Sequence, residues 1–243
     1  MIHTTPYDAM FSTVIGKEYQ MLQLICPIAP IMSHLVGTTV GAIPDRMTPL
    51  QVVELGGGTG ITTLALLSGK SNLHILSVDN EPTMQNQAKQ HLKKWVDAGQ
   101  LSFSGEDALS ALKGLADNSM DIIASAYTLH NFLNSYRAQV LKEIFRVLKP
   151  NGQFVNGDRY ALNDIRQHTR LTQEEISQYF KVLTEINRTD LLEQWIVHLF
   201  NDESEDHVMR EGVAMHQMQE AGFTRIKISN RKGVNALVTA SKP

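Results

Sequence analysis

Residues 52–60 read VVELGGGTG, an apolar run that passes directly into a turn containing four glycines. Glycine permits tight turns and lets the backbone approach a ligand closely, because it has no Cβ. In open α/β sheets, ligands bind at the ends of strands, where the following helices begin. The stretch therefore predicts a strand, a ligand-binding loop and a helix in succession.

Apolar runs and helical patterns alternate on both sides of this loop. The runs typical of strands are residues 51–55, 73–78, 101–104, 121–126, 153–156, 225–229 and 236–241. Helical patterns between the first five strands cover residues 61–68, 82–98 and 135–148. This alternation predicts an α/β fold in which helices cover both faces of a mostly parallel sheet.

The composition is that of an ordinary globular protein of 243 residues, with 42% hydrophobic and 19% charged residues. A formal net charge of −3 gives no overall attraction to nucleic acid, so we expect no nucleic-acid partner. Cys26 is the only cysteine, and no internal disulfide can form. The N-terminus has no signal-peptide pattern, and we expect a cytoplasmic protein.

Residues 21–43 contain no Lys, Arg, Asp or Glu and are long enough to span a bilayer. Pro27 and Pro30 interrupt this segment, and polar residues dilute it. We therefore expect two buried helices with a break between them, and no membrane span. Such helices can pack on the domain itself or on a second subunit, which would make the protein a homodimer.

Acidic residues near the ends of the first three expected strands select the kind of ligand. Glu54 would repel a diphosphate, and the loop spacing G-x-G-x-G differs from the dinucleotide-binding pattern. A carboxylate at this place suits an ammonium or sulfonium group. Asp79 can accept hydrogen bonds from two ribose hydroxyls, and Asp107 can meet an adenine amine. Adenine, ribose and a cationic amino-acid group without phosphate describe S-adenosylmethionine.

Five motifs in this order resemble class I S-adenosylmethionine-dependent methyltransferases. They are VVELGGGTG, SVDNEP, DIIASAYTLHNF, LKEIFRVLKPNGQFV and EAGFTRIKI. The resemblance covers the chain from about Tyr7 to the C-terminus, although residues 159–210 match only in layout. It implies a Rossmann-like, seven-stranded sheet whose last strand is antiparallel and lies beside the fifth. It also implies a methyltransferase that uses S-adenosylmethionine.

The resemblance assigns cofactor contacts by position. The implied cofactor-binding residues are Glu54, Gly56, Gly58, Gly60, Asp79, Asn80, Asp107, Ala108, Ala126 and Tyr127. Three of the polar assignments have structural alternatives. Glu54 could be an acid near a helix N-terminus, and Asp107 and Asn80 could cap the helices that follow them.

Methyl transfer from a sulfonium needs a positioned acceptor, and a hydroxyl or thiol acceptor also benefits from a general base. His130, in YTLHNF, is the candidate base, and the alternative is a histidine that orients the loop. Many relatives carry a second histidine where this chain has Asn131. The expected substrate-binding residues are Tyr7, Asn131, Arg159, Tyr160 and Trp195.

Arg159 and Tyr160 follow the fifth expected strand and are predicted to face the same cleft. Arg159 could hold a substrate carboxylate or pair with Asp158 or Asp164 on the surface. Trp195 could belong to a helical core or shape an apolar pocket. The acceptor is expected to be a small molecule, but the sequence does not identify it.

Three parts of the chain are expected. Residues 1–48 form an N-terminal helical segment, residues 49–158 and 211–243 form the cofactor-binding core, and residues 159–210 form a helical lid insertion. Thr172 and Glu175 have capping-box spacing. A helix is expected over residues 205–221, with Gly222 just beyond its end. The later histidines lack metal-ligand spacing, so no metal is expected.

Two other function classes remain open from the sequence. One is another S-adenosylmethionine-using enzyme, similar to carboxy-S-adenosylmethionine synthase or to a tRNA-modification enzyme. The other is a non-catalytic partner protein that binds the cofactor without turnover.

Overall fold

The computed structural model describes residues 22–243, so the contacts predicted for Tyr7 lie outside the described residues. The strands are β1 (Leu50–Leu55), β2 (Leu73–Val78), β3 (Leu101–Ser104), β4 (Met120–Ala126), β5 (Leu148–Arg159), β6 (Thr224–Lys232) and β7 (Asn235–Ser241). The helices before β4 are α2 (Leu22–Ile25), α3 (Ile28–Gly41), α4 (Ile61–Gly69), α5 (Pro82–His91), α6 (Lys93–Asp97) and α7 (Ala108–Lys113). After β4 come the short 3₁₀ helix η3 (Leu129–Asn131), α8 (Asn134–Val147), α9 (Ile165–Glu185), α10 (Thr189–Asp202) and α11 (Glu211–Ala221).

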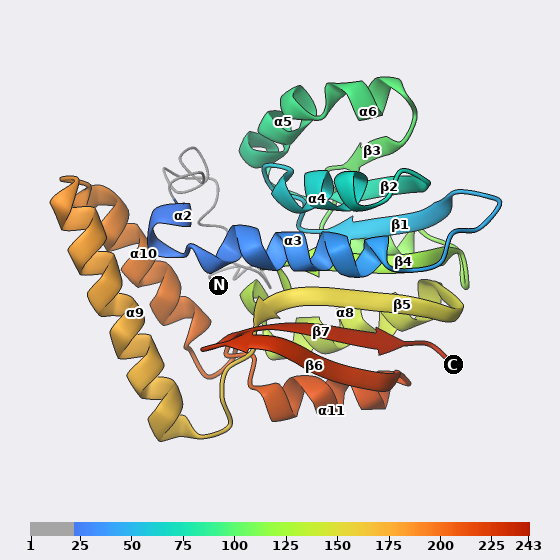
Figure 1. Cartoon of the computed structure of the whole chain (residues 1–243). Coiled ribbons are helices and arrows are strands. Elements are labelled where there is room, and N and C mark those ends of the chain that lie inside the picture. Colours follow the sequence, from blue (N-terminus) through green and yellow to red (C-terminus); the bar gives the residue numbers. More distant parts are fainter. Residues whose placement is uncertain (1–21) are drawn as a thin grey trace, which may run out of the picture.

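The strands form one seven-stranded sheet in the order β3-β2-β1-β4-β5-β7-β6 (Figure 1). β1 pairs in parallel with both β2 and β4, and β7 is antiparallel to both β5 and β6. The predicted fold class is confirmed, including an antiparallel last strand beside the fifth. The strand order reverses between β1 and β4, which is where open α/β sheets bind ligands.

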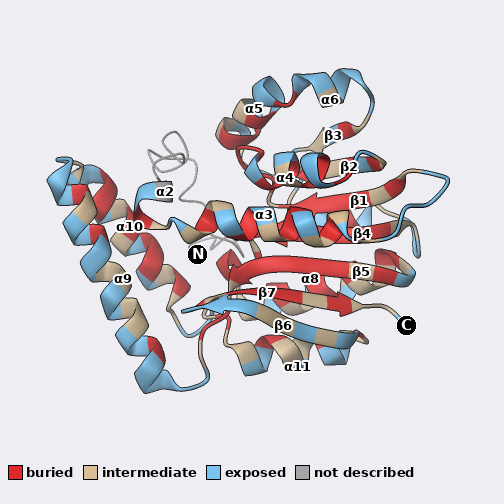
Figure 2. Ribbon diagram, in the orientation of Figure 1, coloured by how far each residue is buried: buried red, intermediate tan, exposed pale blue. Residues whose placement is uncertain are grey.

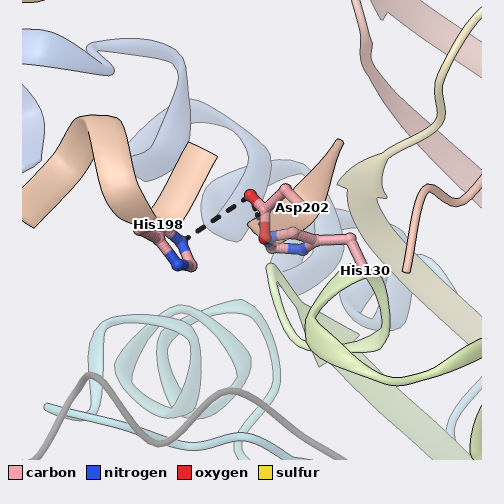
Figure 3. Close-up of side chains that lie close together, drawn as sticks. All are labelled: His130, His198 and Asp202. Carbon is pink, nitrogen blue, oxygen red and sulfur yellow. Dashed lines mark ion pairs between the residues drawn. The ribbon is translucent and has the colours of Figure 1, made fainter. Parts of the chain in front are cut away.

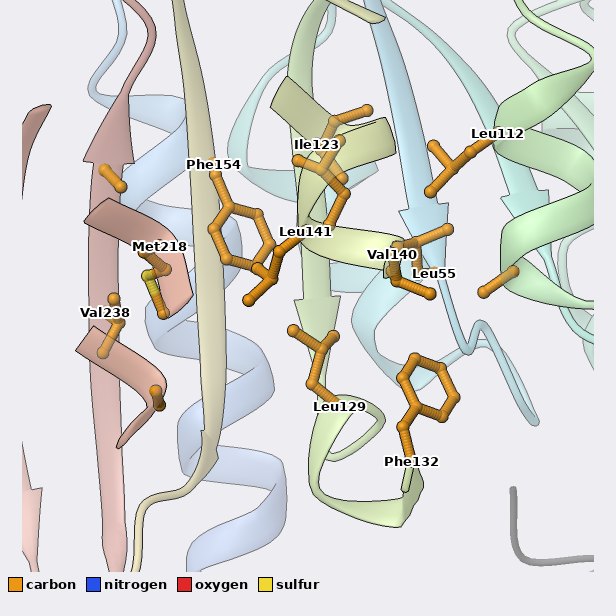
Figure 4. Packing of buried hydrophobic residues seen from close by; sticks show 14 of the residues in the cluster. Leu55, Leu112, Ile123, Leu129, Phe132, Val140, Leu141, Phe154, Met218 and Val238 are labelled. Atoms are coloured by element: carbon orange, nitrogen blue, oxygen red, sulfur yellow. The ribbon is translucent and has the colours of Figure 1, made fainter. Parts of the chain in front are cut away.

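Two hydrophobic clusters hold helices on opposite faces of the sheet (Figures 1 and 2). In one, Leu112 of α7, Leu141 of α8 and Met218 of α11 pack with strand residues such as Ile123 and Phe154 (Figure 4). In the other, side chains of α3, α4 and α5 pack against strand residues of the opposite face. The carboxyl ends of β1, β2, β4 and β5 consequently meet at one edge, between the two layers.

Helices α2 and α3 confirm the prediction of two helices with a break. Gly37 lets α3 cross α4 closely. A Cβ added at this position would lie only 2.5 Å from the Ala65 carbonyl oxygen. The apolar face of α3 is buried inside its own chain, with Met32, Val36 and Val40 all 0% exposed. None of the helices in residues 22–243 combines the length and the apolar character that a bilayer crossing requires. The homodimer stays a prediction.

Two expected helix boundaries were wrong. The helix expected over residues 82–98 is interrupted at Leu92, between α5 and α6. The helix expected from residue 205 begins only at Glu211, because Arg210 forms a β-bridge with Ala161. Its predicted end is confirmed, since Gly222 has φ 105° directly after α11.

The predicted capping box at Thr172 was also wrong. α9 already begins at Ile165, and Asp164 caps it by accepting a hydrogen bond from the Gln167 N–H. Thr172 lies inside the helix and donates to the His168 carbonyl. The fifth strand, expected over residues 153–156, likewise begins earlier, since β5 starts at Leu148 and includes Asn151 at φ 64°.

Candidate active site

The glycine loop after β1 needs glycine for two different reasons. Gly56 has φ 69°, and a Cβ there would lie 2.0 Å from Thr128 Oγ1. Gly58 has φ 52°, and its N–H donates to Asp79 Oδ2 at 2.7 Å. Gly60, at φ 90°, precedes α4, and a Cβ there would lie 2.8 Å from Leu92 Cδ1. The first two positions shape the loop, and the third also lets α5 pack against it.

Glu54 is the last residue but one of β1, inside the sheet, and it is 0% exposed. Thr63 Oγ1 donates to Glu54 Oε2 at 2.6 Å, whereas Oε1 has no hydrogen-bond partner among the residues described. Burial raises the pKa of the Glu54 carboxyl to about 7, although Thr63 and Ser77 oppose the shift by hydrogen bonding. A buried carboxylate oxygen without a partner is suited to a cationic ligand.

Glu54→Gln is expected to change how stability depends on pH. A carboxyl whose pKa is raised by folding stabilises the protein below its unfolded pKa of 4.5, and this contribution is lost as the pH rises through about 7. The contribution is at most about 3 kcal/mol. Urea unfolding at pH 5 and pH 8 should therefore show a smaller loss of unfolding free energy in the variant than in the wild type. Equal losses in both proteins would contradict a raised pKa at Glu54.

Asp79 follows β2 and organises the second loop. Its Oδ2 accepts from the Gly58 N–H and its Oδ1 accepts from the Glu81 N–H at 2.8 Å. Each oxygen retains a lone pair for a further donor, such as a ribose hydroxyl. Asn80 is exposed and does not cap α5, because Glu81 takes that role by accepting from the Thr83 N–H.

Asp107 caps α7, as the structural alternative had it. The carboxylate accepts from the N–H groups of Leu109 and Ser110 and from the Tyr136 hydroxyl at 2.7 Å. Burial alone would raise the pKa of Asp107, but hydrogen bonds from Ser110 and Tyr136 hold it below its ordinary value. Ala108 is the buried first residue of α7. Contact of this pair with adenine remains a prediction.

A pocket lies beyond the ends of β4 and β5, and α9 and α10 of the expected lid segment form one of its walls. Tyr127 and His130 line it from the segment after β4, and Arg159 lines it from the end of β5. Trp195 lines it from α10 and also packs in the cluster that joins α9 to α10, and substrate binding by this residue stays a prediction. Ala126, the last residue of β4, is buried immediately before Tyr127.

His130 is held by Asp158 at the floor of this pocket. The two residues are 6% and 0% exposed, and His130 Nδ1 lies 2.6 Å from Asp158 Oδ1. Asp158 also accepts the N–H groups of Leu129 and Arg159. Although burial opposes it, the charge and hydrogen bond of His130 lower the pKa of Asp158 below its ordinary value. An ionised Asp158 fixes Nδ1 as the donor and leaves Nε2 directed away from it.

His198 and Asp202 of α10 approach His130 from the opposite side (Figure 3). Asp202 Oδ2 lies 3.7 Å from His130 Nε2 and 3.7 Å from His198 Nε2. All three side chains are buried. The pocket therefore contains two imidazoles and a carboxylate that converge from η3 and α10.

Arg159 is not at the surface, and neither acid expected to pair with it does so. Its guanidinium donates to Glu175 at 2.7 and 3.0 Å and lies 3.5 Å from Glu203. Asp158 instead binds His130, and Asp164 caps α9. The ion pair with Glu175 occupies the donors that would hold a substrate carboxylate.

Tyr160 and Asn131 do not line the pocket. The prediction that Tyr160 faces the same cleft as Arg159 is wrong, because successive strand residues point to opposite faces. Tyr160 is 0% exposed in the core, and its hydroxyl accepts from Asn156 Nδ2 at 2.8 Å. Asn131 is 8% exposed and donates to the Tyr127 carbonyl, so it stabilises the segment that joins β4 to η3.

Comparison with known proteins agrees with this geometry. Residues 53–156 match the model of a family described as a methyltransferase domain. This part of the chain is similar to methyltransferase domains. The match runs from β1 into β5 and therefore includes the glycine loop, Asp79 and His130. The resemblance to class I methyltransferases is confirmed.

Two curated relatives and one solved structure place the methyltransferase domain among known proteins. The chain is 35% identical to a demethylmenaquinone methyltransferase of Leptospira interrogans over 109 residues. This aligned stretch covers 45% of this chain and 43% of that protein. It thus spans less than half the length of that relative. A carboxy-S-adenosyl-L-methionine synthase of Erwinia tasmaniensis is 25% identical over 212 residues, 76% of this chain and 85% of that protein. A methyltransferase structure from Thermotoga maritima has a TM-score of 0.62 at 16% identity, covering 96% of this chain and 98% of the other.

Sequence reasoning missed four titratable residues that surround His130 in and beside the pocket. They are Asp158, Glu175, His198 and Asp202. Asp158 carries a recognisable signal, since it is an acid near the end of a parallel strand. The other three come from helices whose orientation to the sheet has no signal in a single sequence.

Proposed function

We propose that the protein is a methyltransferase that uses S-adenosylmethionine to methylate a small-molecule acceptor by in-line displacement. The observation that carries the proposal is the buried Glu54 Oε1, which has no partner among the described residues and lies beneath the glycine loop of a methyltransferase domain. A cytoplasmic location and a small acceptor without nucleic acid are parts of the same proposal. S-adenosylmethionine would supply a methyl group already activated on a sulfonium.

The residues present fit that cofactor. Glu54 offers a buried oxygen to the methionine ammonium, and Gly56 lets the loop pass against Thr128, with which a Cβ would collide. Asp79 retains acceptor capacity for the ribose while its backbone hydrogen bonds hold the two loops together. Within residues 22–243, neither Glu54 nor Asp79 has a Lys or Arg partner, which favours a cofactor without phosphate.

The pocket walls determine what the chain does to an acceptor. Trp195 and Leu199 contribute apolar surface that excludes water, and Tyr127 lies next to the end of β4. His130 Nε2 faces the pocket because Asp158 holds Nδ1. An acceptor placed between these groups would have its heteroatom near His130, the group positioned to take up a proton from it.

Asp79→Ala is expected to weaken S-adenosylmethionine binding by about 10- to 150-fold, because a charged acceptor of ribose hydroxyls contributes about 1.5–3 kcal/mol. Calorimetric titration of wild type and variant measures this, with thermal unfolding to show that both are folded. The exposed Asp97→Ala variant is the matched control and should bind like the wild type. A folded wild-type protein that does not bind the cofactor would contradict the proposal.

A second candidate is remodelling of the cofactor, as the name of the Erwinia relative describes for that protein. The match to that relative covers 76% of this chain, which supports cofactor remodelling as a second candidate function. The ion pair of Arg159 with Glu175 opposes it, since an anionic co-substrate would need a cation that is not already paired. Mass spectrometry of the reaction decides between a methylated acceptor with S-adenosylhomocysteine and a carboxylated cofactor.

A further inference from the structure

We propose that His130, His198 and Asp202 bind a divalent metal ion, which zinc represents best. The ligand atoms available from these three residues all lie within 4.8 Å of one another and point to a common centre between η3 and α10 (Figure 3). Two histidines and one carboxylate are a recurrent set for catalytic zinc, and they leave further coordination positions open. The sequence predicted no metal, because it gives no sign that residues 130 and 198 meet.

The two distances from the carboxylate to the imidazoles need only a small contraction, and all three ligand atoms lie within 4.8 Å of one another. Nitrogen and oxygen ligands bind zinc at about 2.0–2.2 Å, so two of them in a tetrahedron lie about 3.3–3.5 Å apart. Asp202 Oδ2 is 3.7 Å from the Nε2 atoms of both His130 and His198. That separation is too long for a hydrogen bond but only a few tenths of an ångström from a zinc site.

The incomplete hydrogen bonding of Asp202 is an independent indication of a bound cation. Its side chain is 5% exposed, and its Oδ1 has no hydrogen-bond partner within the described part of the chain. The guanidinium of Arg159 lies 3.9 Å from Oδ2, but its Nη atoms are held by Glu175. A buried carboxylate that is left this incompletely bonded is costly unless a cation reaches it.

The charges around the pocket also leave room for a dication. The carboxylates of Asp158, Asp202, Glu175 and Glu203 are at most 20% exposed. The guanidiniums of Arg137 and Arg159 balance two of the four. His168 Nε2 also lies 2.6 Å from Glu203, and a divalent ion would offset the carboxylate charge that these cationic groups leave unbalanced.

Asp158 completes the arrangement as an outer partner of the metal. It accepts the Nδ1–H of His130 at 2.6 Å, which fixes Nε2 as the atom with a free lone pair. Metal-binding histidines commonly donate their other N–H to a carboxylate in this way, which increases the basicity of the ligand. With the ion bound, His130 is a ligand and not a base. On the proposed function, an acceptor with a hydroxyl or thiol would be activated at an open position of the metal.

Titration of metal-free, tag-free protein with zinc tests the site directly. Calorimetry should show one ion per chain, and cobalt should give the visible absorption of a low-symmetry nitrogen and oxygen site. His198→Gln and Asp202→Asn should each weaken zinc binding by at least about tenfold, and Asp158→Asn should weaken it by about 10- to 100-fold. The matched control is His216→Ala, which removes an exposed histidine paired with Glu220 and should bind like the wild type.

Circular dichroism and thermal unfolding of each variant show whether it is folded, and S-adenosylmethionine titration of the same samples reports separately on the cofactor site. Zinc binding that is absent from the wild type, or unchanged in both His198→Gln and Asp202→Asn, would overturn the metal site. A cobalt spectrum with sulfur charge-transfer bands that vanish in Cys26→Ser would also overturn it, by assigning the ion to the thiol. Loss of cofactor binding with zinc binding intact would contradict the proposed function alone.

Discussion

His130→Asn is expected to lower the rate of methyl transfer by about 10²- to 10⁴-fold, the range that an acid–base group contributes. The amide nitrogen of asparagine can replace Nδ1 in the hydrogen bond to Asp158, which is 2.6 Å long in the native protein. It offers nothing at the position of Nε2. The substitution therefore removes the pocket-facing atom while it preserves the support of the loop.

The measurement is the release of S-adenosylhomocysteine with an acceptor identified by screening. Affinity for S-adenosylmethionine should stay within about twofold of the wild type, because Glu54 and Asp79 are unchanged. Turnover of His130→Asn at the wild-type rate would show that Nε2 takes no part in the chemistry. The variant loses activity whether Nε2 is a base or a metal ligand, and the zinc titration separates those roles.

The cofactor half of the site could be predicted from the sequence because it is local. Short turns at the ends of strands position Glu54, the glycines and Asp79. The ligand that these residues can bind follows from their types and their order in the sequence. The structure adds that Asp79 also holds the Gly58 N–H, a bond across 21 residues. The place of the last strand, antiparallel beside the fifth, followed from the resemblance to a family, and alternation alone would have left it open.

The acceptor half could not be predicted because it is assembled from distant segments. His130 and Asp202 are 72 residues apart in the printed numbering and meet only because α9 and α10 fold back over the end of β5. The ion pair of Arg159 with Glu175 was not predicted, since a single sequence does not show which helix will cover a strand end. Tyr160 was misplaced for a different reason. Neighbouring residues in extended backbone point to opposite faces of the sheet, so Tyr160 points away from the face of Arg159.

Arg137 holds together two segments of the acceptor half, although nothing in its sequence context marks it. Its side chain is 0% exposed, and its guanidinium donates to the carbonyls of Leu129, Phe132 and His207 at 2.6–2.9 Å. It therefore ties η3, which carries His130, to the segment between α10 and α11. Burial lowers the pKa of Arg137 to about 10, so the group is still charged at neutral pH.

Arg137→Met is expected to lower the free energy of unfolding by about 3–5 kcal/mol, because it leaves several buried carbonyls without donors. Arg137→Lys keeps the charge but cannot reach the same set of acceptors, and it should lose a large part of that amount. Urea unfolding measures both, with the exposed Arg170→Met as the matched control, which should change stability by less than about 0.5 kcal/mol. If Arg137→Met were as stable as the control, the carbonyls would be satisfied by other donors, and the position of His130 would have to be explained by Asp158 alone.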